Sequence, residues 1–315
     1  MSFSGEVKEE LTRQQSPGRH CQIAEIAAIL CMSGSVEEQE PSGYRIRVVT
    51  ENADVAARFT ALTRRAFHIT PDDEITASPA RRASEARCLT IQNPEDARRV
   101  LSAVKLLDSE GRPTLDLTLA NHLVVRQSCC RRAFIRGAFL ASGSMSDPSK
   151  SYHFEIVCSN EAAARQLEDI IRTFHVPVRT IRRKSRFVVY IKEGEGIVDI
   201  LGLMEARVAL MNMENIRILK EMRNSVNRQV NCEAANIGKT VSAAMKQIED
   251  ITYIKNHIGF SRLSDALAET ARLRVEYPDA TLKELGGMFE PPVGKSGVSH
   301  RLKKLSEIAE NCREQ

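Results

Sequence analysis

Hydrophobic and polar positions in the first two thirds of the chain alternate between helical and strand spacing. The run Ala24–Val36, "AEIAAILCMSGSV", predicts an apolar helix of small residues that ends in Ser-Gly-Ser. The segment from Tyr44, "YRIRVVTENADVAARFTALTRRAFHI", predicts an alternating strand and then a helix that opens near Asn52. Downstream, "DEITASPA" and "CLTIQNPEDARRVLSAVKLL" predict two further strands and a helix.

The same order of elements is predicted a second time. The run Ala133–Pro148, "AFIRGAFLASGSMSDP", repeats the small-residue helix and its Ser-Gly-Ser ending 109 residues later. It is followed by "YHFEIVCSNEAAARQLEDIIRTFHV" from Tyr152, by "VRTIRRKS" and by "FVVYIKEGEGIVDILGLM". Each half is therefore predicted as helix–strand–strand–helix–strand–strand–helix, which indicates an internal duplication.

The predicted fold class is α+β. Strands with one polar, basic face and one apolar face need helices to cover the apolar face. Two such halves, packed through their small-residue helices, would form a pseudo-twofold saddle. Ala27, Ala28, Gly137 and Ala138 would let the two backbones approach closely. The alternative is that each helix packs only on its own sheet, but repetition at matched positions favours the paired arrangement.

The last third of the chain changes character. From Asn212 it predicts helices with an asparagine-rich joint. Their basic residues recur at helical spacing and are expected to form a solvated face, with a nucleic-acid contact as the less favoured alternative; they are Arg217, Lys220, Arg223 and Arg228. Beyond this connector, Leu263–Val275 predicts a helix that the turn at Pro278 stops. Thr281 is expected to cap a short helix to about Phe289, and Ser296 to cap another through Ile308. This outline is typical of a helix-turn-helix.

The predicted domains are thus an N-terminal helix (1–19), a two-repeat domain (20–211, with repeats at about 20–108 and 128–205), a helical connector (212–256) and an all-α helix-turn-helix domain (257–315).

The last predicted helix has two distinct faces. Val298, Leu302, Leu305 and Ile308 share one face at helical spacing. No acidic residue occurs between Pro291 and Ser306, so the other positions can meet phosphates or base edges. The alternative is an ordinary solvated surface helix. The candidate DNA-binding residues here are Lys295, Ser296, Ser299, His300, Arg301, Lys303 and Lys304.

Composition is typical of a globular protein, with 42% hydrophobic and 27% charged residues in 315. No apolar run approaches the roughly 20 residues needed to span a bilayer. The start, "MSFSGEVKEELTRQQ", resembles no targeting segment, so we expect a cytoplasmic protein.

The formal net charge is only +4, but the basic residues are concentrated. Two stretches lack acidic residues, one between Asp116 and Asp147 and one between Asp169 and Glu193. One-signed stretches suit a polyanion, although any single one could be a solvated face. The first contains Arg126, Arg131, Arg132 and Arg136; the second contains Arg172, Arg179, Arg182, Arg183, Lys184, Arg186 and Lys192.

The cysteines show no metal-ligand spacing. Eight are scattered along the chain without a CxxC or Cys/His pattern. A disulfide framework or a structural zinc site is therefore not expected. The vicinal pair Cys129 and Cys130 has no evident role. The others are Cys21, Cys31, Cys88, Cys158, Cys232 and Cys312.

The two-repeat half resembles the single-chain LAGLIDADG homing endonucleases. The segments "IAAILCMSG" (26–34) and "IRGAFLASG" (135–143) lie over the nine-letter motif of that family. In the nucleases an acidic residue before the final glycine reaches divalent metal ions. Here those positions are Ser33 and Ser142, which are neutral, so the resemblance implies the saddle but neither a metal site nor cleavage. The remaining candidates for DNA contact are Arg182, Arg183, Lys184 and Arg186.

Over the whole chain the sequence resembles the bacterial WhiA family. The resemblance rests on "NCEAANIGKTVSAAMKQIEDI" and "LKELGGMFEPPVGKSGVSHRLKKLSEIAE", which follow the LAGLIDADG-like pair. Its most specific parts are "KSGVSHRL" and the two serine-terminated motifs. The resemblance implies a non-enzymatic, nucleoid-associated protein that binds double-stranded DNA and needs no cofactor. In sporulating actinobacteria the family regulates transcription, and more widely it is tied to cell division and chromosome segregation.

Two other functions stay open at this point. A metal-dependent endonuclease is disfavoured by Ser33 and Ser142. A scaffold whose basic saddle binds an acidic protein is not separated from a DNA binder by charge alone. The transcription machinery and a partner regulator are further candidate partners.

Overall fold

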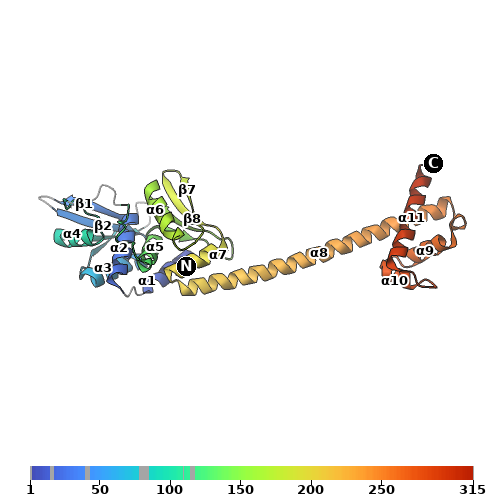
Figure 1. Ribbon diagram of the computed structural model, residues 1–315, viewed down its shortest axis with the longest axis horizontal. Coiled ribbons are helices and arrows are strands. Elements are labelled where there is room, and N and C mark those ends of the chain that lie inside the picture. The colour runs from blue at the N-terminus through green and yellow to red at the C-terminus, as the bar shows by residue number, and fades with distance from the viewer. Residues whose placement is uncertain are drawn as a thin grey trace. The chain divides into compact units, whose positions relative to one another are not determined.

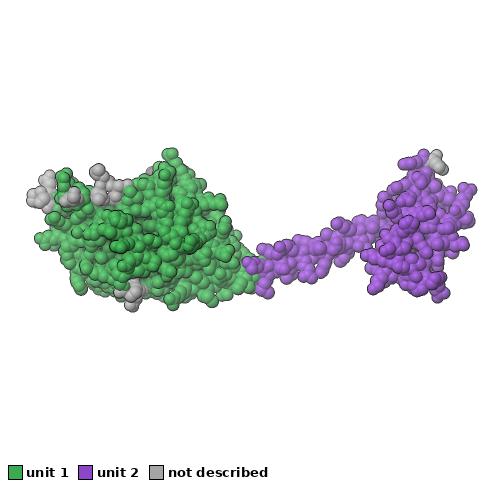
Figure 2. Space-filling model, viewed as in Figure 1, with its two compact units in different colours: residues 1–220 green, residues 221–315 purple. Residues whose placement is uncertain are grey.

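The computed structural model describes residues 2–14, 18–39, 43–77, 85–108, 110–113 and 118–314. The chain divides into two compact units, residues 1–220 and 221–315 (Figure 2). No helix within the described residues is both long and apolar enough to cross a membrane.

The first repeat follows the order predicted from the sequence. Helix α2 (Arg19–Ser33) leads into strands β1 (Gly34–Gln39) and β2 (Gly43–Thr50), and α3 (Ala53–Phe67) follows. Strands β3 (Asp72–Ala77) and β4 (Glu85–Ile91) and helix α4 (Pro94–Ala103) complete it. The strands form one antiparallel sheet in the order β1-β2-β4-β3. Residues 78–80 of the predicted strand "DEITASPA" lie outside the described residues.

The second repeat has the same elements in the same order. Helix α5 (Ser128–Ser142) is followed by β5 (Gly143–Met145), β6 (Phe154–Cys158) and α6 (Glu161–Arg172). Strands β7 (Arg179–Arg183) and β8 (Arg186–Ile191) and helix α7 (Gly194–Met204) complete it. The sheet order β5-β6-β8-β7 matches that of the first repeat, which confirms the duplication.

Matched residues have matched local structure in the two repeats. The side chain of Asn52 accepts hydrogen bonds from the amides of Asp54 and Val55, and Asn160 accepts one from Ala163. Both asparagines therefore cap their helices, and α3 begins near Asn52 as predicted. His68 and His175, in the two Phe-His segments, both adopt the left-handed conformation, with φ of 62° and 61°.

The seam between the repeats is the pair α2 and α5, which lie side by side between the two sheets (Figure 1). A Cβ atom at Gly137 would lie 2.6 Å from the carbonyl oxygen of Glu25 and 2.9 Å from the Cβ of Ala28. Only glycine therefore allows this close approach of the backbones. The paired arrangement predicted from Ala27, Ala28, Gly137 and Ala138 is what the structure shows.

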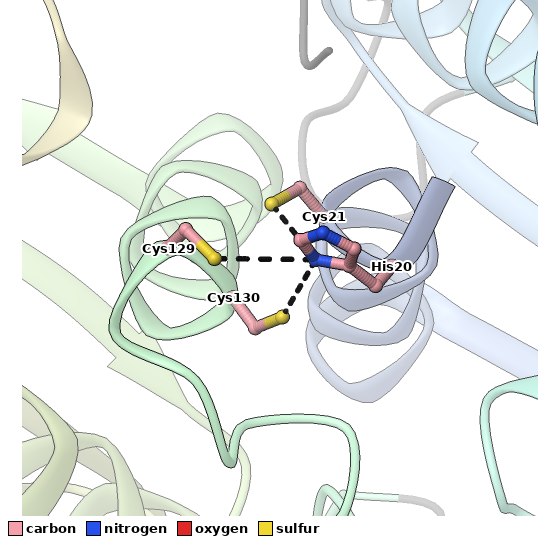
Figure 3. Close-up of side chains that lie close together, drawn as sticks. All are labelled: His20, Cys21, Cys129 and Cys130. Atoms are coloured by element: carbon pink, nitrogen blue, oxygen red, sulfur yellow. Dashed lines mark hydrogen bonds between the residues drawn. The ribbon is translucent and has the colours of Figure 1, made fainter. Parts of the chain in front are cut away.

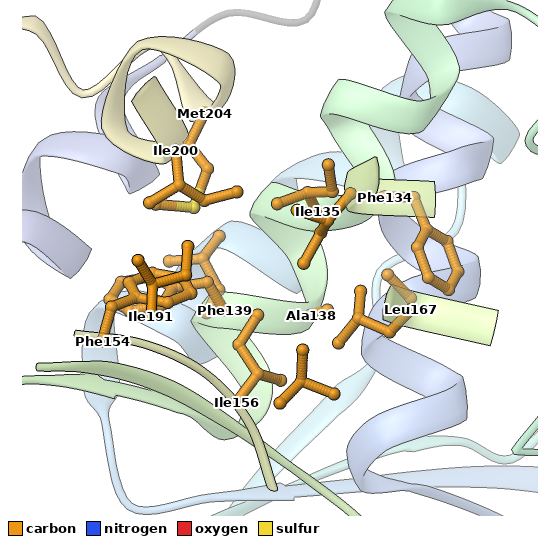
Figure 4. Close-up of a cluster of buried hydrophobic side chains, with 14 of the residues drawn as sticks. Phe134, Ile135, Ala138, Phe139, Phe154, Ile156, Leu167, Ile191, Ile200 and Met204 are labelled. Carbon is orange, nitrogen blue, oxygen red and sulfur yellow. The ribbon is translucent and has the colours of Figure 1, made fainter. Parts of the chain in front are cut away.

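Each repeat buries the apolar face of its sheet under its own helices. In the second repeat, Phe139 stacks on Phe154 with ring centroids 5.1 Å apart. Figure 4 shows Ile135 and Ala138 of α5 converging with Ile156 of β6 in the same cluster. Helix α1 (Phe3–Arg13) adds Val7 and Leu11 to it. The predicted N-terminal helix is thus present but stops before α2 begins.

The predicted asparagine-rich joint is absent. Helix α8 runs without a break through 51 residues, Arg207–His257. The stretch contains no proline, and its asparagines lie on exposed positions where their side chains need not compete with the helix backbone.

The helix-turn-helix region follows a 3₁₀ turn at Phe260–Arg262 and comprises α9 (Asp265–Glu276), α10 (Leu282–Gly287) and α11 (Lys295–Arg313). Thr281 caps α10 in a full capping box with Glu284, as predicted, and hydrogen bonding to the Thr281 backbone amide lowers the pKa of Glu284. The prediction that Ser296 caps the last helix is wrong. Helix α11 begins at Lys295 with Gly294 as its N-cap, so Ser296 lies within the first turn.

Candidate nucleic-acid interface

Helix α11 buries one face and exposes the other. Val298, Leu302 and Leu305 are almost completely buried and pack with Leu285 and Phe289 of the preceding segment. The apolar face predicted from the sequence is therefore committed to the core. The predicted DNA-binding residues that are exposed are Lys295, Ser296, Ser299, His300, Lys303 and Lys304.

Arg301 differs from the other candidates on this helix. It is half-buried, and its guanidinium lies 5.0 Å from the ring centroid of Phe289. This cation–π contact places the guanidinium beside an aromatic ring of the core. Lys303 lies 3.9 Å from Glu307 one turn later, an exposed pair that adds little stability.

The turn before α11 depends on a second close glycine. A Cβ at Gly286 would lie 2.2 Å from the carbonyl oxygen of Val293, whose amide donates to the carbonyl of Gly286. Glycine at this position lets the turn fold back onto α10 and so fixes where α11 begins.

The four basic candidates of the second repeat lie on the β7–β8 hairpin, and all are exposed. They do not share one face. Arg183 and Arg186 are directly opposite each other on the open side of the sheet. Arg182 is paired with Phe187 and points to the helix-covered side, while Lys184 lies in the turn with a φ of 57°.

Part of this positive charge is already neutralised by Glu155 on the open side of the sheet. Arg183 pairs with its carboxylate at 3.1 Å, and His153 lies 2.9 Å from the same oxygen. Although burial acts to raise the pKa of Glu155, these contacts hold it below its usual value. In the first sheet, Arg45 and Arg47 both pair with Glu37 and lower the pKa of that carboxyl.

Three arginines of the basic stretch between Asp116 and Asp147 have structural contacts, while Arg126 is exposed. Arg136 is 3% exposed and is held by Glu25, by the Met204 carbonyl and by Glu205. Arg132 lies over the ring of Phe174. Arg131 donates to backbone carbonyls. Each of these arginines therefore has a structural contact that the charge count could not reveal.

Glu25 is the centre of a buried ionic network at the seam. Its carboxylate accepts two hydrogen bonds from Arg58, at 2.7 and 2.9 Å, and one from Arg136 at 3.2 Å. Arg58 also donates to the Thr12 carbonyl. One carboxylate from α2 thus joins the second repeat through Arg136, which nothing in the linear pattern indicated.

The nuclease metal positions hold two serines whose hydroxyls bond within their own helices. Ser33 donates to the Ile29 carbonyl at 3.0 Å, and Ser142 donates to the Ala138 carbonyl at 3.3 Å. Each serine is the last residue of its helix, and the two helices lie side by side, as the resemblance implied. Within the described residues, no group of three or more metal-ligating side chains gathers there.

Such a group gathers instead at the opposite end of the seam. The ligand atoms of His20, Cys21, Cys129 and Cys130 all lie within 4.8 Å of one another (Figure 3). Burial raises the pKa of the Cys21 thiol to about 12 and also raises that of Cys130. The prediction from the sequence used only the spacing of the cysteines along the chain. Spacing does not show that two pairs 109 residues apart lie close together in the fold.

These features define a class: a two-repeat LAGLIDADG-like domain without the nuclease carboxylates, followed by a helix-turn-helix domain. The sequence matches three family descriptions in order: the WhiA N-terminal LAGLIDADG-like domain (residues 19–107), the WhiA LAGLIDADG-like domain (131–223) and the WhiA C-terminal HTH domain (226–309). The chain belongs to the WhiA family.

Relatives match along the whole chain. A protein of Lachnoclostridium phytofermentans, named probable cell division protein WhiA, is 49% identical and covers 100% of both chains. A protein of the same name from Alkaliphilus oremlandii is 44% identical over 100% of this chain and 98% of its own. The crystal structure of full-length WhiA from Thermotoga maritima shares the fold, with a TM-score of 0.60, 23% identity and 99% coverage of each chain.

Proposed function

We propose that this protein is a non-enzymatic DNA-binding regulator of transcription that acts in cell division and chromosome segregation. The observation that carries the proposal is α11, which buries its apolar face and leaves a polar, basic face exposed. A helix of this kind in a helix-turn-helix domain is suited to enter the major groove of DNA.

His300 and Lys303 are the best candidates for contacts with bases. They lie one turn apart on the exposed face, in the amino-terminal half of α11, where recognition helices usually meet base edges. Ser296 and Ser299 precede them on the same face. Lys295 and Lys304 can contact phosphates. Arg301, half-buried with its guanidinium near the Phe289 ring, can both support the helix and add positive charge beside the exposed face.

The β7–β8 hairpin is the second proposed DNA contact. Its cations are exposed and surround a tight turn, so they suit phosphates better than bases. Arg183 and Arg186 on the open side are placed to contact a duplex lying along the sheet, whereas Arg182 and Lys184 can only add charge at the tip.

Non-enzymatic action follows from the two serines. A nuclease of this class needs carboxylates at the end of the helix pair to hold divalent metal ions. Ser33 and Ser142 are neutral, and each hydroxyl already donates within its helix. The name of the relatives, probable cell division protein WhiA, supports a cellular role in division. We place this role at the nucleoid, with the transcription machinery or a partner regulator as protein partners.

The experiment is footprinting of the full chain on fragments of its own genome, with and without Mg²⁺ or Mn²⁺. The proposal expects short protected sites and intact DNA in every lane. Absence of any protected site at physiological salt would favour the protein scaffold. Metal-dependent double-strand cleavage that a chelator abolishes would establish the endonuclease instead.

A further inference from the structure

Two vicinal pairs of metal-ligand residues occupy equivalent positions of the two repeats. His20 and Cys21 are the second and third residues of α2, and Cys129 and Cys130 are the second and third residues of α5. Both pairs are separated by the 109 residues that also separate Ser33 from Ser142. The pseudo-twofold relation of the helices therefore brings all four side chains to one end of the seam.

The geometry of the cluster fits one metal ion. The imidazole Nδ1 of His20 lies 3.2 Å from the sulfur of Cys130, 3.3 Å from that of Cys21 and 3.9 Å from that of Cys129. In a tetrahedral zinc site with usual bond lengths, neighbouring ligand atoms lie about 3.5–3.8 Å apart. Figure 3 shows the three sulfurs approaching the same ring nitrogen.

From this arrangement we propose that His20, Cys21, Cys129 and Cys130 bind a structural Zn²⁺ ion that joins the amino-terminal ends of α2 and α5. Three thiolates and one imidazole form a Cys₃His set, a known type of structural zinc site. Sulfur-rich tetrahedral ligation selects zinc over the hard cations Mg²⁺ and Ca²⁺. The ligand atoms are too close together for a four-iron cluster, whose cysteines bind different iron atoms.

The surroundings of the cluster also suit the bound ion. Zn²⁺ with three thiolates carries one net negative charge, and the amino-terminal end of a helix stabilises such charge. Neither α2 nor α5 has a side-chain cap or an acidic residue in its first turn, so the positive ends of both helices are left for the site. Lys105 and Arg126 line the same surface hollow as His20 and Cys130.

The site is at the opposite end of the seam from the lost nuclease centre. Four protein ligands leave no open coordination position, so the ion would act in stability and not in catalysis. It would join the repeats at the end of the helix pair away from Ser33 and Ser142. Because zinc binds the folded chain preferentially, its binding free energy adds to the stability of that unit.

The experiment measures metal in the full chain, purified without a polyhistidine tag or chelator. We expect about one zinc per chain by elemental analysis. After removal of zinc and addition of Co²⁺ to the reduced protein, we expect thiolate-to-cobalt charge transfer in the near ultraviolet and intense tetrahedral bands in the visible.

The variants are Cys129→Ser, which changes an exposed ligand, and Cys21→Ser, which changes a buried one. Each should lose most of the zinc and the tetrahedral cobalt spectrum. Cys232→Ser is the matched control, since this exposed cysteine of α8 lies outside the cluster, and it should keep both. A folded wild-type chain without zinc or a tetrahedral cobalt spectrum, full zinc in folded Cys129→Ser, or a disulfide among these cysteines would overturn the proposal.

Discussion

At the scale of single residues, the seam between the repeats contains buried charged side chains that the surrounding sequence does not indicate. Glu25 lies in an apolar, small-residue helix, yet it is fully buried and holds Arg58 and Arg136. Arg136 lies in a basic stretch that resembles a polyanion-binding surface, yet it faces Glu25. Removal of one charged group from such a buried network is strongly destabilising, because the remaining buried charges lose their partner.

Replacement of Glu25 by Gln should therefore destabilise the first unit by about 3–5 kcal/mol, because it removes the carboxylate that pairs with buried Arg58 and one of the two carboxylates that pair with Arg136. Chemical denaturation of the full chain, followed by a probe in residues 1–220, measures the effect. Glu9→Gln is the control, since Glu9 forms an exposed pair with Arg13 and its loss should cost at most about 0.5 kcal/mol. Equal effects of the two changes would show that the network contributes no special stability.

At the scale of elements, hydrophobic periodicity predicted the order of elements in both repeats and located all of them except the first strand of each, β1 and β5, which follow directly on the Ser-Gly-Ser endings. Local chemistry also located the start of α3 near Asn52 and the cap at Thr281. Three features could not be found this way. The Glu25 network and the His/Cys cluster join residues more than a hundred positions apart, and only tertiary packing creates them. The continuity of α8 was missed because asparagine is a weak helix former that an exposed helix tolerates.

Gly137→Ala tests the contact between α2 and α5. The added methyl group has no space against the Glu25 carbonyl, so it should separate the helices and destabilise the unit by about 1–3 kcal/mol. The control is Gly202→Ala on the exposed side of α7, where the nearest atom would be 3.4 Å away and alanine should be neutral or slightly stabilising. If thermal unfolding shows no difference between the two variants, the seam is not as close as described.

Two double variants of the hairpin test its contact with DNA. Arg183→Ala/Arg186→Ala removes the cations of the open sheet face, and Arg182→Ala/Lys184→Ala removes the same charge from the tip and the other face. The slope of log affinity against log salt should fall by roughly 0.9 for each lost phosphate contact, so the first pair should lower it more. A larger effect of the second pair would place DNA elsewhere, and unchanged slopes for both would exclude the hairpin.

At the scale of the whole molecule, the chain combines a duplicated domain without nuclease carboxylates with a helix-turn-helix. The duplication preserves the helix pair, its glycine contact and its sheets, while serines replace the groups that held catalytic metal. The proposed function requires that such a fold can bind DNA without the nuclease carboxylates, which is possible because phosphate contacts depend on basic residues and not on a metal site. In the function proposed here, readout of sequence falls to α11.

The most direct test is discrimination between a footprinted site and random DNA by variants of α11. His300→Ala and Lys303→Ala should each weaken binding to the footprinted site by about 1–3 kcal/mol, with a smaller loss on random DNA. Lys304→Ala, a phosphate-contact control from the same helix, should weaken both about equally. Circular dichroism first establishes that each variant is folded. Wild-type discrimination by folded His300→Ala and Lys303→Ala variants would contradict α11 as the reader of sequence.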